Sequence, residues 1–137
     1  MGLGLALALP ERKVLVLEGD GAFLMYLTSL ATISHQRPPN LSLVIIDNSC
    51  DESGGGNPTV NAGRTDFLRL AQGAGIENAH RAESAEELGR AYELAQARGG
   101  PALLWAKVTP TFEPEPPLPL SREEIKEGFL RHLRGEG

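Results

Sequence analysis

The 137-residue chain has little cysteine and histidine and no excess of positive charge, and each shortage excludes a class of protein. Its one cysteine, Cys50, cannot form an intrachain disulfide, which excludes a disulfide-stapled secreted fold. The three histidines, His35, His80 and His132, are not spaced for a Cys/His zinc site. Basic residues number 13 against 18 acidic ones and form no basic cluster, so we expect no nucleic-acid partner.

A long apolar run is also missing. The apolar residues 1–10 fall far short of the ~20 residues that a membrane-spanning helix needs. They have no cationic leader and no clear cleavage site, as a secretory signal peptide would have. We therefore expect a cytoplasmic protein with no membrane partner, although an apolar start is unusual because chain ends are normally exposed.

The remaining pattern is that of a single globular domain over residues 1–137, with 41% hydrophobic and 23% charged residues. Short apolar runs predict strands at residues 13–18, 41–47 and 102–108, and a brief edge strand at residues 79–81. Helices are predicted at residues 22–34 and 65–74 and behind two capping boxes that begin at Ser84 and Ser121. Strands without polar alternation, alternating with helices, predict a three-layer αβα fold with a mostly parallel sheet. The proline-rich residues 110–120 predict an extended connector to the last helix.

Two predicted strands end in polar residues suited to binding a cation. Gly19-Asp20-Gly21 follows the first strand and Asn48 follows the second, and the carboxyl ends of parallel strands share one edge of the sheet. A carboxylate and an amide oxygen suit Mg²⁺ or Ca²⁺, and a helix starting near Ala22 would direct its amides toward a phosphate. Gly-Asp-Gly alone is equally a simple turn, but Asn48 and the glycine-rich loop at residues 48–64 favour a binding site.

Asp20 within Gly-Asp-Gly, with Asn48 28 residues later, resembles the thiamine-diphosphate motif of thiamine-dependent enzymes. Other segments resemble the decarboxylases of sulfopyruvate and phosphonopyruvate, and the resemblance covers nearly the whole chain. These segments are residues 2–8, 24–25, 30–32, 52–53, 55–56, 58–59, 65–66, 75–76 and 121–129.

The resemblance implies that Asp20, the side-chain oxygen of Asn48 and the backbone carbonyl oxygen of Cys50 ligate Mg²⁺. It implies a wider set of residues that bind thiamine diphosphate, namely Gly19, Asp20, Gly21, Ala22, Asn48, Cys50, Glu52 and Ser53. In that set, Gly21 and Ala22 would offer backbone amides to the diphosphate, and the loop at residues 52–59 would close over the cofactor. Glu52 is the only acid placed near the reaction, and no catalytic residue is otherwise assigned to this chain.

The chain departs from the family pattern in several places. Asp47 stands where many relatives carry a second asparagine, Asp51 where close relatives often carry tyrosine, and Asn57 where they often carry glutamine. The last two lie in the active-site loop, so the substrate within the class of 2-oxo acids stays open. The family's cofactor domain also begins earlier, with a strand and a helix that we expect this chain to lack.

We therefore expect the cofactor-binding subunit or fragment of a thiamine-diphosphate- and Mg²⁺-dependent 2-oxo acid decarboxylase, a lyase of the sulfopyruvate/phosphonopyruvate type. In the family a pyrimidine-binding domain on another chain carries the activating glutamate, so activity should require that partner. The alternatives are an acetolactate-synthase-like enzyme domain and a non-catalytic remnant that pairs with a subunit. The apolar side chains of Leu3, Leu5, Leu7 and Leu9 predict an oligomer, because a monomer would leave them uncovered.

Overall fold

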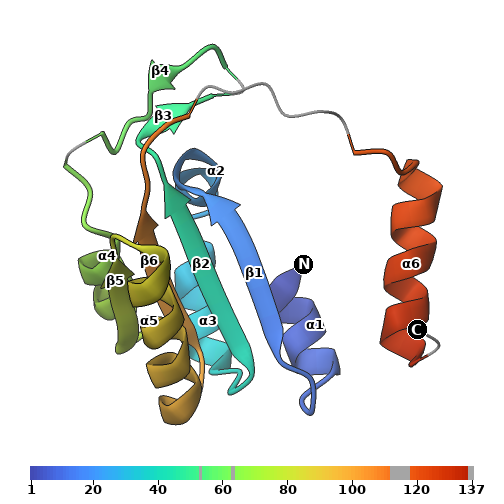
Figure 1. Cartoon of the computed structure of the whole chain (residues 1–137). Helices are drawn as coiled ribbons and strands as arrows, with labels where there is room; N and C mark the ends of the chain where they lie inside the picture. Colours follow the sequence, from blue (N-terminus) through green and yellow to red (C-terminus); the bar gives the residue numbers. More distant parts are fainter. Residues whose placement is uncertain (53, 63, 112–117, 136–137) are drawn as a thin grey trace.

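A four-stranded parallel sheet forms the centre of the computed structural model, which describes residues 1–52, 54–62, 64–111 and 118–135 (Figure 1). Its strands are β1 (Val14–Gly19), β2 (Leu41–Asp47), β5 (Asn78–Ala82) and β6 (Ala102–Lys107). They lie in the order β1-β2-β6-β5, so β1 and β5 are the two edges. The four predicted strands are thus confirmed, including β5 as an edge strand.

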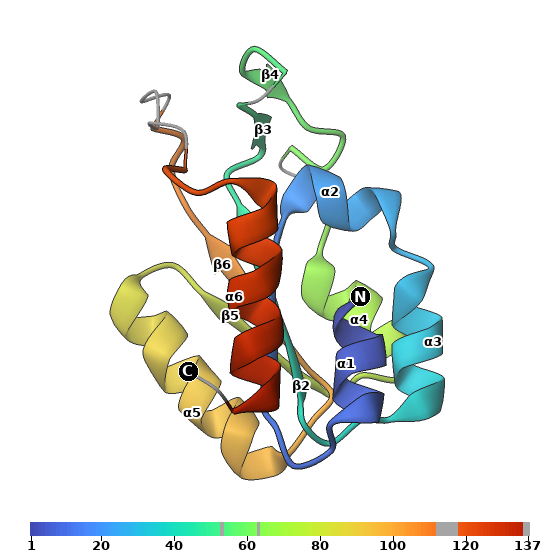
Figure 2. The same cartoon turned by 90° about the vertical axis from the view of Figure 1, so that its right-hand side faces the viewer.

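Helices cover both faces of the sheet, which confirms the predicted three-layer αβα fold (Figures 1 and 2). One face packs against α1 (Gly2–Ala8), α2 (Asp20–Met25), α3 (Ser29–Gln36) and α4 (Phe67–Gly73). The other face packs against α5 (Ala85–Arg98), whose small residues Ala91 and Ala95 lie on Val44 and Leu104. Within the described residues, no helix is long and apolar enough to span a bilayer.

The larger core lies on the four-helix side and is built around aromatic rings. Phe67 of α4 is fully buried and contacts Phe23 edge-on at a centroid distance of 5.6 Å and Trp105 at 5.5 Å. Such edge-to-face pairs add to the stabilisation from burying apolar area. This aromatic row links α4, α2 and β6 directly beneath the carboxyl ends of the strands.

The predicted helix at residues 22–34 is wrong in its continuity, because the structure divides it into α2 and α3. Between them the amides of Tyr26 and Ser29 bond to carbonyls three residues back, so the chain turns more tightly than an α-helix. Thr28 and Ser29 lie at this break, and such residues favour turns and helix starts over helix interiors. The break ends α2 at Met25, so α2 is a short helix that begins at Asp20, and α3 begins separately at Ser29.

Three further elements refine the sequence-based description. The apolar residues 2–8, for which no element was predicted, form α1, and the glycine-rich loop contains a small ribbon of β3 (Cys50–Asp51) and β4 (Asn57–Pro58). The capping box at Ser121 is complete. The one at Ser84 is only half formed, since the Glu87 carboxylate accepts the amide of Glu83 and not that of Ser84.

The last helix, α6 (Arg122–Arg134), stands on the β1 side of the sheet and has no buried residue (Figure 1). It meets the rest of the chain through Phe129 and through a 2.8 Å contact between Arg12 Nη2 and His132 Nε2. Of the predicted connector at residues 110–120, residues 112–117 lie outside the described ranges.

Candidate functional site

The carboxyl ends of β1 and β2 bring the two predicted loops together. Gly19 at the end of β1 pairs in register with Ile46 of β2, so Asp20 starts α2 beside the end of β2. Asp47 and Asn48 follow directly on that neighbouring strand. The prediction that both loops lie at one edge of the sheet is therefore confirmed.

A cleft of about 710 Å³ lies between the start of α2 and the β3–β4 ribbon. Several residues that the sequence assigned to the cofactor line it, namely Gly19, Asp20, Gly21, Ala22, Cys50 and Glu52. Ser53 lies outside the described residues, so its assignment stays a prediction. Met25, Val60 and Thr59 also line the cleft, and none of the described residues that line it is a lysine, arginine or histidine.

Asp20 is buried, with 2% of its surface exposed, and its carboxylate faces the ribbon. Its Oδ2 accepts a hydrogen bond of 2.6 Å from the hydroxyl of Thr59. The approach is close at Gly21 too, where a Cβ would lie 3.4 Å from Cγ2 of Thr59. The ribbon therefore folds directly over the first turn of α2.

Asn48 lies beside the cleft and is not among its lining residues. Its Oδ1 accepts the amide of Cys50 at 3.0 Å, and its Nδ2 donates to Glu52 Oε1 at 3.0 Å. Ser49, between Asn48 and Cys50, has a left-handed φ of 57°, which turns the chain sharply after β2. An amide oxygen with one hydrogen bond retains a second lone pair, so Asn48 can still coordinate a cation.

Cys50 contributes a carbonyl that the ribbon does not use. Cys50 lies opposite Pro58, and because the neighbouring Ser49 carbonyl accepts the Thr59 amide at 3.1 Å, Cys50–Pro58 is a non-hydrogen-bonded pair of the antiparallel ladder. Burial and the nearby carboxylates of Glu52, Asp51 and Asp20 raise the pKa of the Cys50 thiol. A raised pKa leaves little thiolate at neutral pH, so the side chain is not an activated nucleophile.

One carboxylate, one amide oxygen and one carbonyl form a donor set of hard oxygen atoms. Such atoms match Mg²⁺, which prefers oxygen ligands and leaves positions for water and phosphate. Among the described residues, no group of three His, Cys, Asp or Glu side chains could hold a metal ion by itself, so a cation here would also need amide and backbone oxygens. The residues present therefore fit a magnesium ion held together with a diphosphate.

Two residues that the sequence analysis did not assign connect the cleft to the core. Thr59 Oγ1 lies 2.6 Å from Asn61 Oδ1, and Asn61 is 2% exposed. The Asn61 amide contacts Asp47 Oδ1 at 3.4 Å. Thr59 appeared in the family resemblance only as the end of the covering loop at residues 52–59, and nothing in the sequence distinguishes Asn61 from an ordinary loop asparagine.

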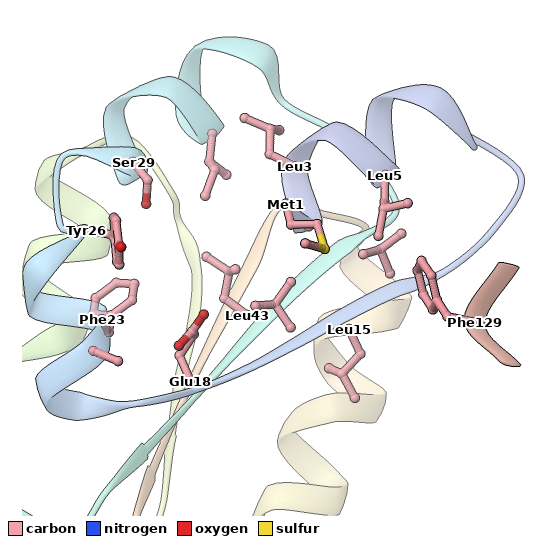
Figure 3. Close-up of a pocket in the computed structure, with 15 residues that line it drawn as sticks. Met1, Leu3, Leu5, Leu15, Glu18, Phe23, Tyr26, Ser29, Leu43 and Phe129 are labelled. Carbon is pink, nitrogen blue, oxygen red and sulfur yellow. The ribbon is translucent and has the colours of Figure 1, made fainter. Parts of the chain in front are cut away.

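A second cavity, of about 720 Å³, lies on the other side of α2 and is mainly apolar (Figure 3). Leucines of α1 and β1, Phe23 and Phe129 line it, and Glu18, Tyr26 and Ser29 supply its polar atoms. None of the predicted cofactor-binding residues except Ala22 lines it, so the cleft at Asp20 is the better candidate for chemistry.

Comparisons with known proteins agree with this geometry. The family model "Thiamine pyrophosphate enzyme, C-terminal TPP binding domain" matches residues 1–106. The chain is 37% identical over 135 residues to sulfopyruvate decarboxylase subunit beta of Methanothermobacter thermautotrophicus, covering 98% of this chain and 69% of that protein. It is 37% identical over 110 residues to phosphonopyruvate decarboxylase of Streptomyces viridochromogenes, covering 80% of this chain and 27% of that protein.

Among solved structures, the thiamine diphosphate-dependent 4-hydroxybenzoylformate decarboxylase of Rhodococcus jostii RHA1 superposes with a TM-score of 0.65 at 26% identity. The match covers 82% of this chain and 22% of that one. A parallel sheet with polar strand ends beside a cleft, together with these matches, defines the cofactor-binding domain of a thiamine-dependent enzyme. The chain belongs to the thiamine pyrophosphate enzyme family, in its C-terminal TPP-binding domain, and the two relatives named above are decarboxylases of the kind that the sequence motifs indicated.

Proposed function

We propose that this chain is the cofactor-binding subunit of a thiamine-diphosphate- and Mg²⁺-dependent 2-oxo acid decarboxylase of the sulfopyruvate/phosphonopyruvate type. The observation that most directly supports this proposal is that Asp20 and Asn48 lie at the ends of the adjacent strands β1 and β2, beside a cleft of about 710 Å³. The names of its relatives supply the substrate class.

In this proposal Asp20, the amide oxygen of Asn48 and the carbonyl oxygen of Cys50 hold Mg²⁺. Asp20 is the only charged member of the set, and its burial keeps water from competing for the cation. Cys50 lies opposite Pro58, which does not hydrogen-bond to the Cys50 carbonyl oxygen, so that oxygen is available to the ion. Together the three would fix the ion at the end of the sheet, where it neutralises a diphosphate.

The amides of Gly21 and Ala22 lie in the first turn of α2, where backbone N–H groups have no acceptor within the helix. They are the donors we assign to the diphosphate. When bound, thiamine diphosphate supplies the electron sink that receives the electron pair left as CO₂ departs from a 2-oxo acid. The chain's own contribution is to anchor and orient that group, with Glu52 on the covering loop as the acid nearest to the substrate.

The proposal includes a partner chain that carries the pyrimidine-binding domain and its activating glutamate. A relative named as a beta subunit supports this, because such a name belongs to a protein with another kind of subunit. We further propose that the assembly is cytoplasmic, which the free thiol of Cys50 supports. The acidic cleft lining leaves the binding of an anionic 2-oxo acid to cationic groups of the partner.

The test is a decarboxylation assay on the chain reconstituted with a pyrimidine-domain subunit, thiamine diphosphate and Mg²⁺. We expect CO₂ release from sulfopyruvate or phosphonopyruvate at a rate well above that from pyruvate. The Asp20→Ala variant should be inactive because its cation site loses its charge. Glu77→Ala removes an exposed carboxylate outside the cleft lining and should match the unmodified chain.

Three outcomes distinguish the alternatives. Preferred turnover of pyruvate to acetolactate would indicate the acetolactate-synthase-like alternative. A stable complex that binds no thiamine diphosphate would indicate a non-catalytic remnant. Full activity of Asp20→Ala would contradict the assignment of the cation site while leaving the family membership intact.

A further inference from the structure

The hydroxyl of Thr59 lies between two oxygen acceptors. Asp20 Oδ2 and Asn61 Oδ1 are each 2.6 Å from Thr59 Oγ1. Asp20 and Asn61 are both 2% exposed, so water does not readily replace either contact. A hydroxyl carries one proton, so Thr59 donates to only one of the two oxygens at a time.

The charge on Asp20 decides which oxygen receives the proton. A hydrogen bond to an ionised acceptor is roughly twice as strong as one to a neutral acceptor, so the bare carboxylate takes it. In the structure the Asn61 amide directs Oδ1 to Thr59 and Nδ2 to Asp47, and turning it over would lose the 3.4 Å contact and set Oδ1 against the Asp47 carboxylate. A cation held by Asp20 would offset the charge on that carboxylate and so favour donation from Thr59 to Asn61.

Asn61 also borders the buried Asp47 carboxylate. Asp47 Oδ1 receives the Ser49 amide at 2.9 Å and Lys107 Nζ at 3.0 Å, and its Oδ2 receives the Trp105 indole at 2.8 Å. The orientation of the Asn61 amide thus adds a donor to Asp47 or removes one. A continuous set of contacts runs from Asp20 through Thr59 and Asn61 to Asp47 and Trp105.

Thr59 also secures the ribbon that covers the cleft. Thr59 follows β4, and its amide donates to the carbonyl oxygen of Ser49 at 3.1 Å. Its hydroxyl links the end of the ribbon to Asp20 of α2. Its carbonyl accepts the amide of Ala62 at 3.0 Å, which begins the turn that carries Asn61. Both side chains therefore have fixed backbone positions from which to act on Asp20.

We propose that Thr59 and Asn61 are positioning residues of this site. Thr59 fixes the Asp20 carboxylate and the β4 end of the ribbon, and Asn61 couples that hydrogen bond to the Asp47–Trp105 pair. The inference rests on the proposed function only in taking Asp20 as the ligand of a cation. Neither residue touches the reacting atoms, and both act through Asp20.

The first test uses the full chain without metal, cofactor or partner, so its failure is separate from a failure of the decarboxylation assay. Trp105 is the single tryptophan, so one indole Nε1–H resonance in a ¹⁵N NMR spectrum reports on Asp47. We expect Thr59→Val and Asn61→Ala to shift this resonance, and Thr59→Ser to leave it in place. Hydrogen exchange at the amide of residue 59 should be about tenfold faster in Thr59→Val, while amides of β2 are unchanged.

The matched control is Thr28→Val, which removes an exposed hydroxyl outside the cleft and should change neither readout. In the complex with the partner, Thr59→Val should raise the Mg²⁺ concentration that half-saturates thiamine diphosphate binding about tenfold by calorimetry, and Thr59→Ser should restore it. An unmoved indole resonance in both Thr59→Val and Asn61→Ala overturns the coupling. Unchanged exchange and unchanged Mg²⁺ dependence overturn the positioning role.

Discussion

The indole Nε1–H of Trp105 donates to Asp47 Oδ2 at 2.8 Å, across 58 residues of chain. Lys107 on the same strand forms an ion pair with Asp47 Oδ1 at 3.0 Å. Burial raises the pKa of the Asp47 carboxyl, but hydrogen bonds from Lys107, Trp105 and Ser49 and the charge of Lys107 outweigh it and hold the pKa below its ordinary value. A fully partnered, ionised carboxylate thus anchors the end of β2, from which Asn48 projects.

Replacing Asp47 by alanine should lower the free energy of unfolding by about 3 kcal/mol, because Lys107 and the Trp105 indole then lose a buried partner. Urea unfolding, followed by the fluorescence emission of Trp105, should be measured for both Lys107→Met and Asp47→Ala. Each variant removes one partner of the ion pair. Glu77→Ala, an exposed carboxylate on the α4–β5 connection, should stay within about 0.5 kcal/mol of the unmodified chain. Asp47→Ala unfolding at the same urea concentration as this control would contradict the anchoring role.

The sheet and the edge at which the two polar loops meet could be predicted from sequence because both depend on local patterns. Residues 41–47 form an apolar run that is buried on both faces as a central strand, and Asp20 and Asn48 follow directly on strand ends. Parallel connectivity then brings the two loops together without further information. The chemistry that we propose for these positions came from the family motifs.

The details that depend on tertiary contacts could not be predicted. The break between α2 and α3 places Phe23 against Phe67, a contact between residues far apart in sequence. The roles of Thr59 and Asn61 depend on the path of a glycine-rich loop, which no periodicity describes. The same holds for Asn48, whose side chain bonds within its own loop beside the cleft.

Cys50 should tolerate replacement by alanine with little change in cofactor affinity, because alanine keeps the backbone carbonyl that we assign to the metal. Calorimetry of thiamine diphosphate binding to the complex at saturating Mg²⁺ provides the measurement. Asp20→Ala in the same experiment should abolish binding, since the cation loses its charged protein ligand. Loss of activity in a folded Cys50→Ala complex would mean that the thiol itself takes part.

His80 should make the protein less stable as the solution becomes acidic. Burial, and then the charge of Arg98, lower the pKa of His80 below 6.5, and its Nε2 lies 2.9 Å from Asn78 Oδ1. The native state thus binds fewer protons than the unfolded chain, so this stabilisation is present above pH 6.5 and is lost as the pH falls through the folded-state pKa. Urea midpoints at pH 7.5 and pH 5.5 should differ less in His80→Gln than in the unmodified chain.

The exposed Gln72, which carries no titratable group, is the matched control, and Gln72→Ala should leave the pH dependence as it is. The same loss of stability in His80→Gln as in the unmodified chain would assign the pH dependence to other groups.

The isolated chain should associate with itself and should show no decarboxylase activity. β1 is an edge strand whose Leu15 and Leu17 are 50% and 64% exposed, and α5 on that face packs against β5 and β6. An exposed apolar edge strand pairs readily with another chain, and a lysine on such a strand discourages this pairing.

Leu17→Lys should therefore shift the mass measured by light scattering at low micromolar concentration toward that of one chain. Leu94→Lys, which changes an equally exposed leucine of α5, should not. A monodisperse monomer of the unmodified chain would contradict the expected association, and turnover of a 2-oxo acid by the chain alone would contradict the need for a partner.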